Sequence, residues 1–190
     1  MTSMTGEPSM ADTNAKAERA YYKVHIEAPI ETVWNVLVTT DEVLPFFFGA
    51  VCRTPNGLAP GEPMAMQTKD GKFASVVGKV LEFDPPHRYS HTMMFTNMDD
   101  PASTVTYELK EADGGTEFTL ITDNVPAGTK SEKSMAQGGP FITANLKSLV
   151  ETGKPLMSGR MVMMLGPLMG WFTPKVCRAE NWPFDRIRGF

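Results

Sequence analysis

The chain has 190 residues, 42% of them apolar and 21% charged, a length and balance typical of one globular domain with or without an appendage. Its formal net charge of −4 argues against a general nucleic-acid binder, because phosphate contacts require clustered cations. The two cysteines, Cys52 and Cys177, form neither a disulfide framework nor a pair at metal-binding spacing. They are typical of buried thiols in a reducing compartment.

Three regions differ in composition. Residues 1–19 are polar and lack the apolar stretch of a secretory signal, so we expect them to be disordered and the protein to be cytoplasmic. Residues 20–153 contain the patterned segments of a folded domain, and residues 154–190 form a basic extension rich in methionine.

The folded region opens with a strand and a helix. Tyr22, Val24 and Ile26 alternate with polar residues, which predicts a half-buried strand. After Pro29, apolar residues at helical spacing predict a helix over residues 30–39. Residues 44–49 are interpreted as a short apolar link that a proline keeps out of any long element.

Turn signals then separate a run of strands. Strands are predicted over residues 63–68, 73–83, 87–96, 103–110 and 116–122. Gly138-Gly139-Pro140 is interpreted as the opening of a helix over residues 140–151, with Gly153 as its stop. The order of strand, helix, consecutive strands and long helix predicts an α+β fold with an antiparallel sheet and helices on one face.

Several segments carry a resemblance to a known family. They read IEAPIETVW at residues 26–34, GEP at 61–63, GKVLEFDPP at 78–86, GGTEFTL at 114–120 and PFITANLKSLVETG at 140–153. The chain resembles the START/SRPBCC superfamily over residues 21–153, and within it the branch named after the activator of the Hsp90 ATPase. The chain has Phe46-Phe47-Phe48 and Gly138-Gly139 where the family often has Trp-Phe and Gly-Trp.

The resemblance implies a helix-grip fold, in which a curved antiparallel sheet wraps a long C-terminal helix around a hydrophobic cavity. It implies no shared catalytic set, because the family ranges from carriers of small ligands to cyclases and chaperone partners. From strand faces and the cavity's place in the family, we expect one set of residues to line the cavity. The apolar and aromatic candidates are Trp34, Phe47, Met66, Met93, Phe95 and Tyr107, and His91 is a candidate polar group among them.

Neither a metal site nor a catalytic motif can be recognised. His87 and His91 lie four residues apart on a predicted strand, about 13 Å at 3.3 Å per residue, which is too far for one metal ion. The chain contains no GxSxG, GxGxxG or GK[ST] motif. We therefore expect no metal and no cofactor, and only Tyr107 and His91 are candidate proton donors if the cavity is catalytic.

The fourteen methionines permit two interpretations. They fill gaps in an ordinary core, or they line a pocket that adapts to its ligand. Met64 and Met66 share a strand face, and Met93 lies on another predicted strand, which fits either.

The extension carries six basic and two acidic residues, opposite in sign to the rest of the chain. Its apolar run Met161–Leu165 would be a costly exposed patch. We expect the run to form helix packed near the cavity mouth, either on its own domain or in a homodimer. Membrane contact is the third alternative; the apolar segment is too short to span a bilayer.

These observations favour a non-enzymatic binder of a small hydrophobic molecule. Two alternatives stay open. One is a protein–protein module that acts as a chaperone co-factor, and the other is a cavity enzyme of the cyclase or aromatase kind.

Overall fold

The computed structural model describes residues 19–169 and 173–189. The N-terminal segment expected to be disordered lies, except for Arg19, outside the described residues.

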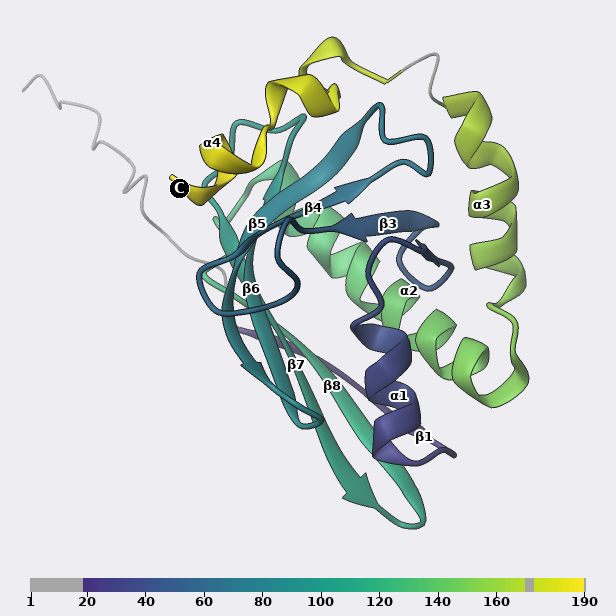
Figure 1. The fold of residues 1–190 in the computed structure, drawn as a ribbon. Coiled ribbons are helices and arrows are strands. Elements are labelled where there is room, and N and C mark those ends of the chain that lie inside the picture. The colour runs from purple at the N-terminus through teal and green to yellow at the C-terminus, as the bar shows by residue number, and fades with distance from the viewer. Residues whose placement is uncertain (1–18, 170–172, 190) are drawn as a thin grey trace, which may run out of the picture.

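One curled antiparallel sheet dominates the fold (Figure 1). Its strands are ordered β1-β8-β7-β6-β5-β4-β3-β2. Consecutive strands from β2 to β8 are therefore neighbours in the sheet, whereas β1 pairs with β8 and lies at the opposite edge from β2. Their bounds are β1 Ala20–Ile26, β2 Val43–Leu44, β3 Ala50–Arg53, β4 Pro63–Gln67, β5 Ala74–Asp84, β6 Arg88–Phe95, β7 Ser103–Ala112 and β8 Gly115–Asp123.

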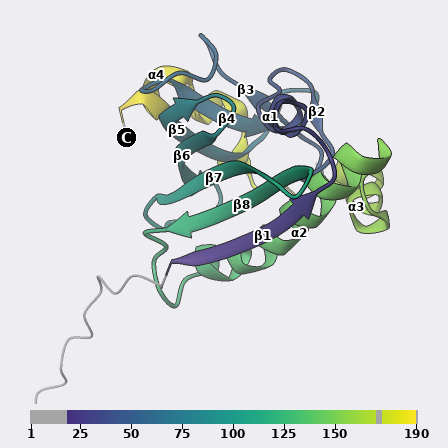
Figure 2. The ribbon, with the colours of Figure 1, turned by 90° about the horizontal axis from the view of Figure 1, so that it is seen from below.

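Two helices pack on the inner face of this sheet. Figure 2 shows the long helix α2 lying along β1 and β8, with α1 near its C-terminal end. The bounds of all α-helices in the described ranges are α1 Ile30–Leu37, α2 Lys130–Thr152, α3 Met157–Met169 and α4 Phe184–Arg188. Short 3-10 turns lie at Lys175–Cys177 and Ala179–Asn181. The predicted α+β, helix-grip architecture is confirmed.

Helix α2 begins ten residues before the start that the sequence predicted. Gly138, Gly139 and Pro140 lie inside it and do not open it. Its true start is a capped turn: the Thr129 hydroxyl accepts a hydrogen bond from the Glu132 amide at 3.2 Å, and the Glu132 carboxylate accepts one from the Gly128 amide at 2.7 Å. This arrangement is close to a capping box and satisfies amides that the helix itself leaves free. Gly153 ends the helix as predicted, at φ +72°.

The segment interpreted as a link contains strand. Val43 pairs with Val51 and Leu44 with Ala50, which adds β2 and β3 to the sheet. Both strands are too short for their alternation to be recognised in sequence.

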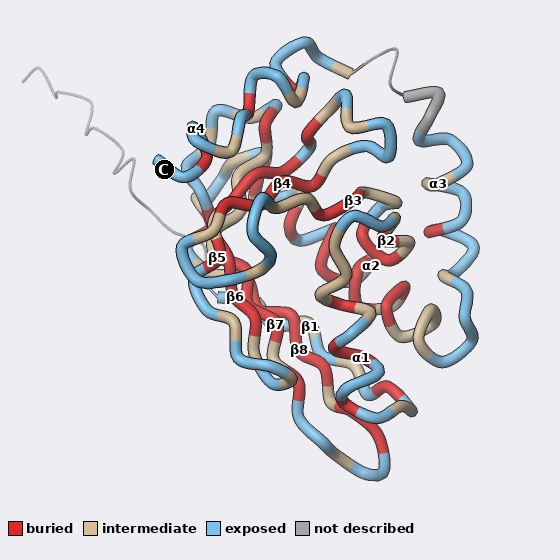
Figure 3. Tube along the Cα trace, in the orientation of Figure 1, coloured by how far each residue is buried: buried red, intermediate tan, exposed pale blue. Residues whose placement is uncertain are grey.

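Alternation along the strands separates two cores. The main core contains Met66 and Val76, whereas Ala65 and Val77, one position along, belong to a second core on the outer face. Figure 3 shows the buried stretches following the strands and α2. Successive side chains of a strand point to opposite faces, so β4 and β5 serve both cores.

The C-terminal segment covers the second core. Trp182 and Ile187, 8% and 0% exposed, pack with Ala65, Ala74 and Val77. The backbone of this segment also joins the body, because the Ala179 amide donates to the Lys72 carbonyl at 2.9 Å. The extension therefore docks on the outer face of its own sheet, through residues outside the methionine run that the sequence singled out.

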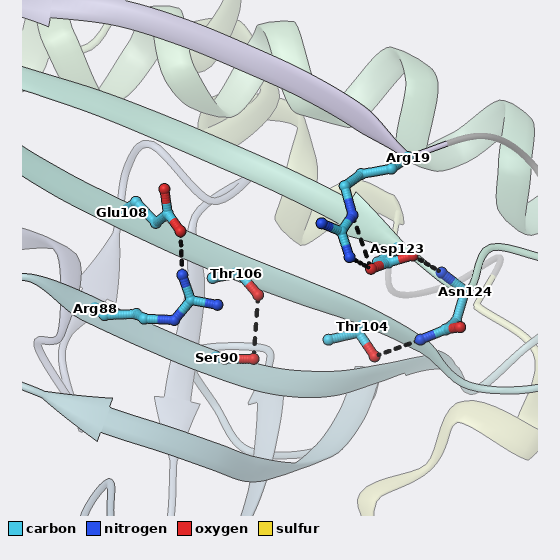
Figure 4. A network of polar contacts seen from close by, with 8 residues as sticks. All are labelled: Arg19, Arg88, Ser90, Thr104, Thr106, Glu108, Asp123 and Asn124. Carbon is cyan, nitrogen blue, oxygen red and sulfur yellow. Dashed lines mark hydrogen bonds and ion pairs between the residues drawn. The ribbon is translucent and has the colours of Figure 1, made fainter.

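The outer face of β6–β8 carries polar pairs (Figure 4). Arg88 pairs with Glu108 across β6 and β7, Arg19 pairs with Asp123, and the Thr106 hydroxyl donates to Ser90 at 3.2 Å. Such exposed ion pairs contribute little stability each, and they keep this face polar. Within the described ranges, no helix has the length and apolar character needed to cross a membrane.

Candidate functional site

A pocket of about 530 Å³ lies between the N-terminal half of α2 and the inner face of the sheet. Strands β5 to β8 form its floor, and the loop before β3 and helix α3 form its rim. Its wall consists of Phe47, Phe48, Ala50, Ser75, Val76, Met93, Phe95, Val105, Tyr107, Leu120, Thr122, Ser134, Met135, Gln137, Gly138, Gly139, Phe141, Ile142 and Val162.

The floor follows from strand alternation. Residues two positions apart on one strand point to the same face, as do Met93 and Phe95 on β6 and Val105 and Tyr107 on β7. Leu120 on β8 is paired in register with Tyr107 and points inward with it. Helix α2 lies opposite this floor, and small residues on it leave the pocket open. Gly138 lines the pocket, and among the described residues outside the nearby helix backbone a Cβ there would come within 4 Å of the Phe48 ring alone, at 3.9 Å. The glycine leaves open space where most helix residues would fill it.

Aromatic rings gather at the rim. The rings of Phe48 and Phe141 stack with centroids 4.3 Å apart and an interplanar angle of 5°, and Phe47 meets Phe48 edge-on. Phe48 has φ +54° and is 44% exposed. A bulky residue rarely adopts this left-handed backbone, and such strain is often found at functional sites.

Helix α3 passes over this rim. Val162 lines the pocket, and Met163 lies so close to Gly49 that a Cβ at that glycine would approach the methionine Cγ to 2.9 Å. The turn before α3 is held by Asn145 of α2, whose Oδ1 accepts from the Leu156 amide at 3.0 Å. The expectation that the methionine run is helical and near the cavity mouth therefore agrees with the structure. Its packing is one-sided, because Met161, Met164 and Leu165 are exposed.

Four of the seven residues expected in the cavity lie in the pocket wall: Phe47, Met93, Phe95 and Tyr107. The other three are buried outside it. Trp34 packs against Phe83 at 5.3 Å, on the part of the core that α1 fills. Met66 on β4 is buried in the main core, and His91 is buried beside Tyr107, with their ring centroids 5.8 Å apart.

The sequence interpretation also missed the pocket residues of the first half of α2. Ser134, Met135, Gln137 and Gly138 were assigned to no helix because the Gly-Gly-Pro triplet was read as a helix start. The Thr129–Glu132 spacing was the signal that marks the true start.

Two buried polar groups, those of His91 and Tyr89, pack beside Tyr107 on the same face of the sheet. His91 Nδ1 lies 2.8 Å from the Thr92 carbonyl oxygen, which can only accept, so Nδ1 carries the proton and Nε2 is an acceptor. Among the described residues, neither His91 Nε2 nor the Tyr89 hydroxyl has a hydrogen-bond partner. Burial lowers the pKa of His91 to about 4 and raises the pKa values of Tyr89 and Tyr107. All three are neutral at pH 7.

This arrangement is poorly suited to acid–base or nucleophilic chemistry. Burial raises the pKa of the Cys52 thiol to about 12, so it too is protonated at pH 7. Within the parts of the chain that the structure describes, no three His, Cys, Asp or Glu side chains are grouped to hold a metal ion.

The family and the fold can be compared with known proteins. Residues 27–151 match the family model described as activator of Hsp90 ATPase homolog 1-like protein. No curated protein sequence matches the chain.

Solved structures share the fold at low sequence identity. The Aha1 dimer from Colwellia psychrerythraea is 16% identical, with a TM-score of 0.58 over 73% of this chain and 99% of its own. CalU16 from Micromonospora echinospora is 15% identical, with a TM-score of 0.54 over 90% and 88%. PFC0360w, an HSP90 activator from Plasmodium falciparum, is 20% identical, with a TM-score of 0.52 over 73% and 99%. With the matched family model covering most of the folded region, the chain belongs to the activator of Hsp90 ATPase homolog 1-like family, as the sequence resemblance indicated.

Proposed function

We propose that the protein binds a small hydrophobic molecule, without transforming it, in the pocket between α2 and the sheet. The observation that carries this proposal is the pocket itself, about 530 Å³ in volume and walled mostly by apolar and aromatic side chains. Sites for small molecules are typically concave, mostly apolar and roughly 300–1,000 Å³ in volume.

The neighbouring polar groups support binding over catalysis. A general acid or base works best with a pKa near the operating pH. His91, Tyr107 and Cys52 all have pKa values displaced away from neutrality by burial. None of them is placed to exchange a proton readily at pH 7.

The ligand contacts follow from the wall. Phe47, Met93, Phe95 and Tyr107 supply contacts from the rim and the floor, and Met135 and Phe141 supply them from α2. Trp34, Met66 and His91 support these residues from the core. The methionines at positions 93 and 135 allow the wall to adapt to ligands of different shape.

Filling the pocket from α2 tests the proposal. The neutral dye N-phenyl-1-naphthylamine, whose fluorescence rises in apolar surroundings, should bind the wild-type protein at one molecule per chain. Gly138→Leu should weaken binding by about tenfold or more, because the added side chain enters the pocket. Gly138→Ala is the matched control, since its single methyl group meets only Phe48 at van der Waals distance.

Comparing the two substitutions distinguishes an effect of filling the pocket from an effect on the stability of the helix. Both replace a helical glycine and should raise helix stability. Weakened dye binding in Gly138→Leu alone therefore supports the pocket as the site. Equal dye binding in all three proteins contradicts the proposal.

A second candidate function is association with another protein surface, including a second copy of the chain. The observation that favours it is the outward face of α3, where Met157, Met161, Met164 and Leu165 are 44–71% exposed. The Colwellia relative is named as a dimer and the Plasmodium relative as an HSP90 activator. Light scattering on the wild-type protein and on Met161→Glu/Met164→Glu tests self-association: a dimer that becomes a monomer supports it, and a wild-type monomer contradicts it.

A further inference from the structure

Among the described residues, the wall of the pocket contains no ionised side chain. All nineteen residues that form it are apolar or neutral, and the polar ones are Ser75, Tyr107, Thr122, Ser134 and Gln137. Burial raises the pKa of Tyr107, so its hydroxyl stays protonated. A charged group brought into this pocket would meet neither an opposite charge nor a fixed counter-ion.

This composition makes entry costly for an ion. Removing a carboxylate or an ammonium group from water costs several kcal/mol unless it is paired and hydrogen-bonded. A few neutral hydroxyl and amide groups replace only part of that hydration. The aromatic faces attract a cation more weakly than its loss of hydration costs.

The same wall suits a neutral ligand. Phe47, Phe48, Phe95 and Phe141 offer apolar faces, and a wall hydroxyl such as that of Thr122 can exchange a hydrogen bond with a hydroxyl or carbonyl of the ligand. A polar but uncharged substituent therefore keeps hydrogen bonds on entry.

We propose that the pocket selects uncharged ligands and excludes ionised acids and amines of the same shape. This inference rests on the proposed binding function and names the chemical class of its ligand.

One position permits the selectivity to be changed deliberately. Gln137 lines the pocket and is also exposed to solvent. An arginine there can keep its guanidinium partly hydrated while it reaches the pocket. Gln137→Arg therefore introduces a cation at the rim, and Gln137→Met is the uncharged control of similar length.

The test uses three competitors with one ring system. 1-Naphthalenemethanol, 1-naphthoate and 1-naphthylmethylammonium differ chiefly in charge at pH 7, and each displaces bound N-phenyl-1-naphthylamine if it enters the pocket. For the wild-type protein, the alcohol should reach half-displacement at a concentration at least about tenfold below either ion. Because ions also prefer water for reasons unrelated to this protein, the variants supply the decisive comparison.

In Gln137→Arg, the ratio of the naphthoate to the alcohol concentration should fall by about fivefold or more, whereas the ratio for the ammonium should not fall. Gln137→Met removes the wall amide without adding a charge, and the fall in the naphthoate ratio is measured against it as well as against the wild type. Equal displacement by the alcohol and either ion in the wild type would overturn the inference. A folded, dye-binding Gln137→Arg protein with unchanged ratios would also overturn it. Absence of dye binding to the wild type would instead contradict the proposed function.

Discussion

A Cβ atom at Gly139 would lie 2.4 Å from Cε2 of the Tyr22 ring, so the backbone of α2 rests directly on an aromatic side chain of β1. At the neighbouring Gly138, the nearest atom to such a Cβ is 3.9 Å away, on Phe48. The two glycines thus have different roles. Gly139 allows close approach of helix and sheet, and Gly138 leaves pocket space open.

This difference predicts opposite effects of the same substitution. Gly138→Ala should raise the free energy of unfolding by about 1 kcal/mol, because alanine favours the helix. Gly139→Ala should lower it by about 1–3 kcal/mol, because the methyl group displaces the Tyr22 ring. Urea unfolding measures both. In a Tyr22→Leu background the cost of Gly139→Ala should shrink, and equal gains from both alanines would contradict the described α2–β1 packing.

A second glycine pair tests how α3 is held over the pocket. A Cβ at Gly159 would lie 2.3 Å from Asn145 Oδ1, the atom that also accepts from the Leu156 amide. At Gly166 such an atom would have no neighbour within 4 Å among the described residues, apart from the nearby backbone of its own helix. Gly159→Ala should speed amide hydrogen exchange along α3, whereas Gly166→Ala should slow it by strengthening the helix. Slower exchange in both variants would show that α3 does not depend on the Asn145 contact.

His91 gives the stability a pH dependence of known sign. Burial lowers its pKa from 6.5 to about 4, so between these values the unfolded chain binds a proton that the folded protein does not. The free energy of unfolding should therefore fall as the pH decreases from 6.5 to 4, by a total of about 3 kcal/mol from this residue. Its contribution does not change above pH 6.5.

The variant His91→Leu isolates this contribution. It removes the titrating group and also the buried Nε2 that lacks a partner. Between pH 7 and pH 4.5, chemical denaturation should show a loss of stability about 2–3 kcal/mol smaller in the variant than in the wild type. Parallel pH profiles would mean that the imidazole is hydrated or paired.

The C-terminal segment should be held by apolar contacts more than by charge. Ile187 is fully buried against Ala65, Ala74 and Val77, and Ile187→Ala should destabilise the docked segment by about 2–5 kcal/mol. The Arg188–Glu62 ion pair, 3.1 Å long with Arg188 48% exposed, should contribute less than about 1 kcal/mol. Limited trypsin digestion should cut at Arg178 and Arg186 faster in Ile187→Ala than in Arg188→Ala. The reverse order would assign the docking to charge.

Strand alternation made much of this fold predictable. Met93, Phe95 and Tyr107 were expected in the cavity from their strand faces, and all three line the pocket. Period-two alternation is a local property, so it survives without knowledge of the partner strands. The C-terminal stop of α2 at Gly153 was predictable for the same reason, because one residue decides it.

The pocket wall was only partly predictable, because it is assembled from distant segments. Phe48, Gly138 and Val162 meet there from a loop, α2 and α3, and no local pattern connects them. His91 shares a strand face with Met93, yet His91 is buried beside Tyr107 and Met93 lies in the pocket wall. The residues that hold the C-terminal segment on the outer face of the sheet were not predictable. Met161 is exposed and Ile187 is buried, yet both are apolar and have similar character in sequence.

The most direct test of the account is a crystal structure of the full chain with bound 1-naphthalenemethanol. The account predicts the naphthalene ring between α2 and the sheet, in contact with Phe141 on one side and Val105 or Tyr107 on the other. An empty pocket, with the ring on the exposed Met161 and Met164 face of α3, would contradict it.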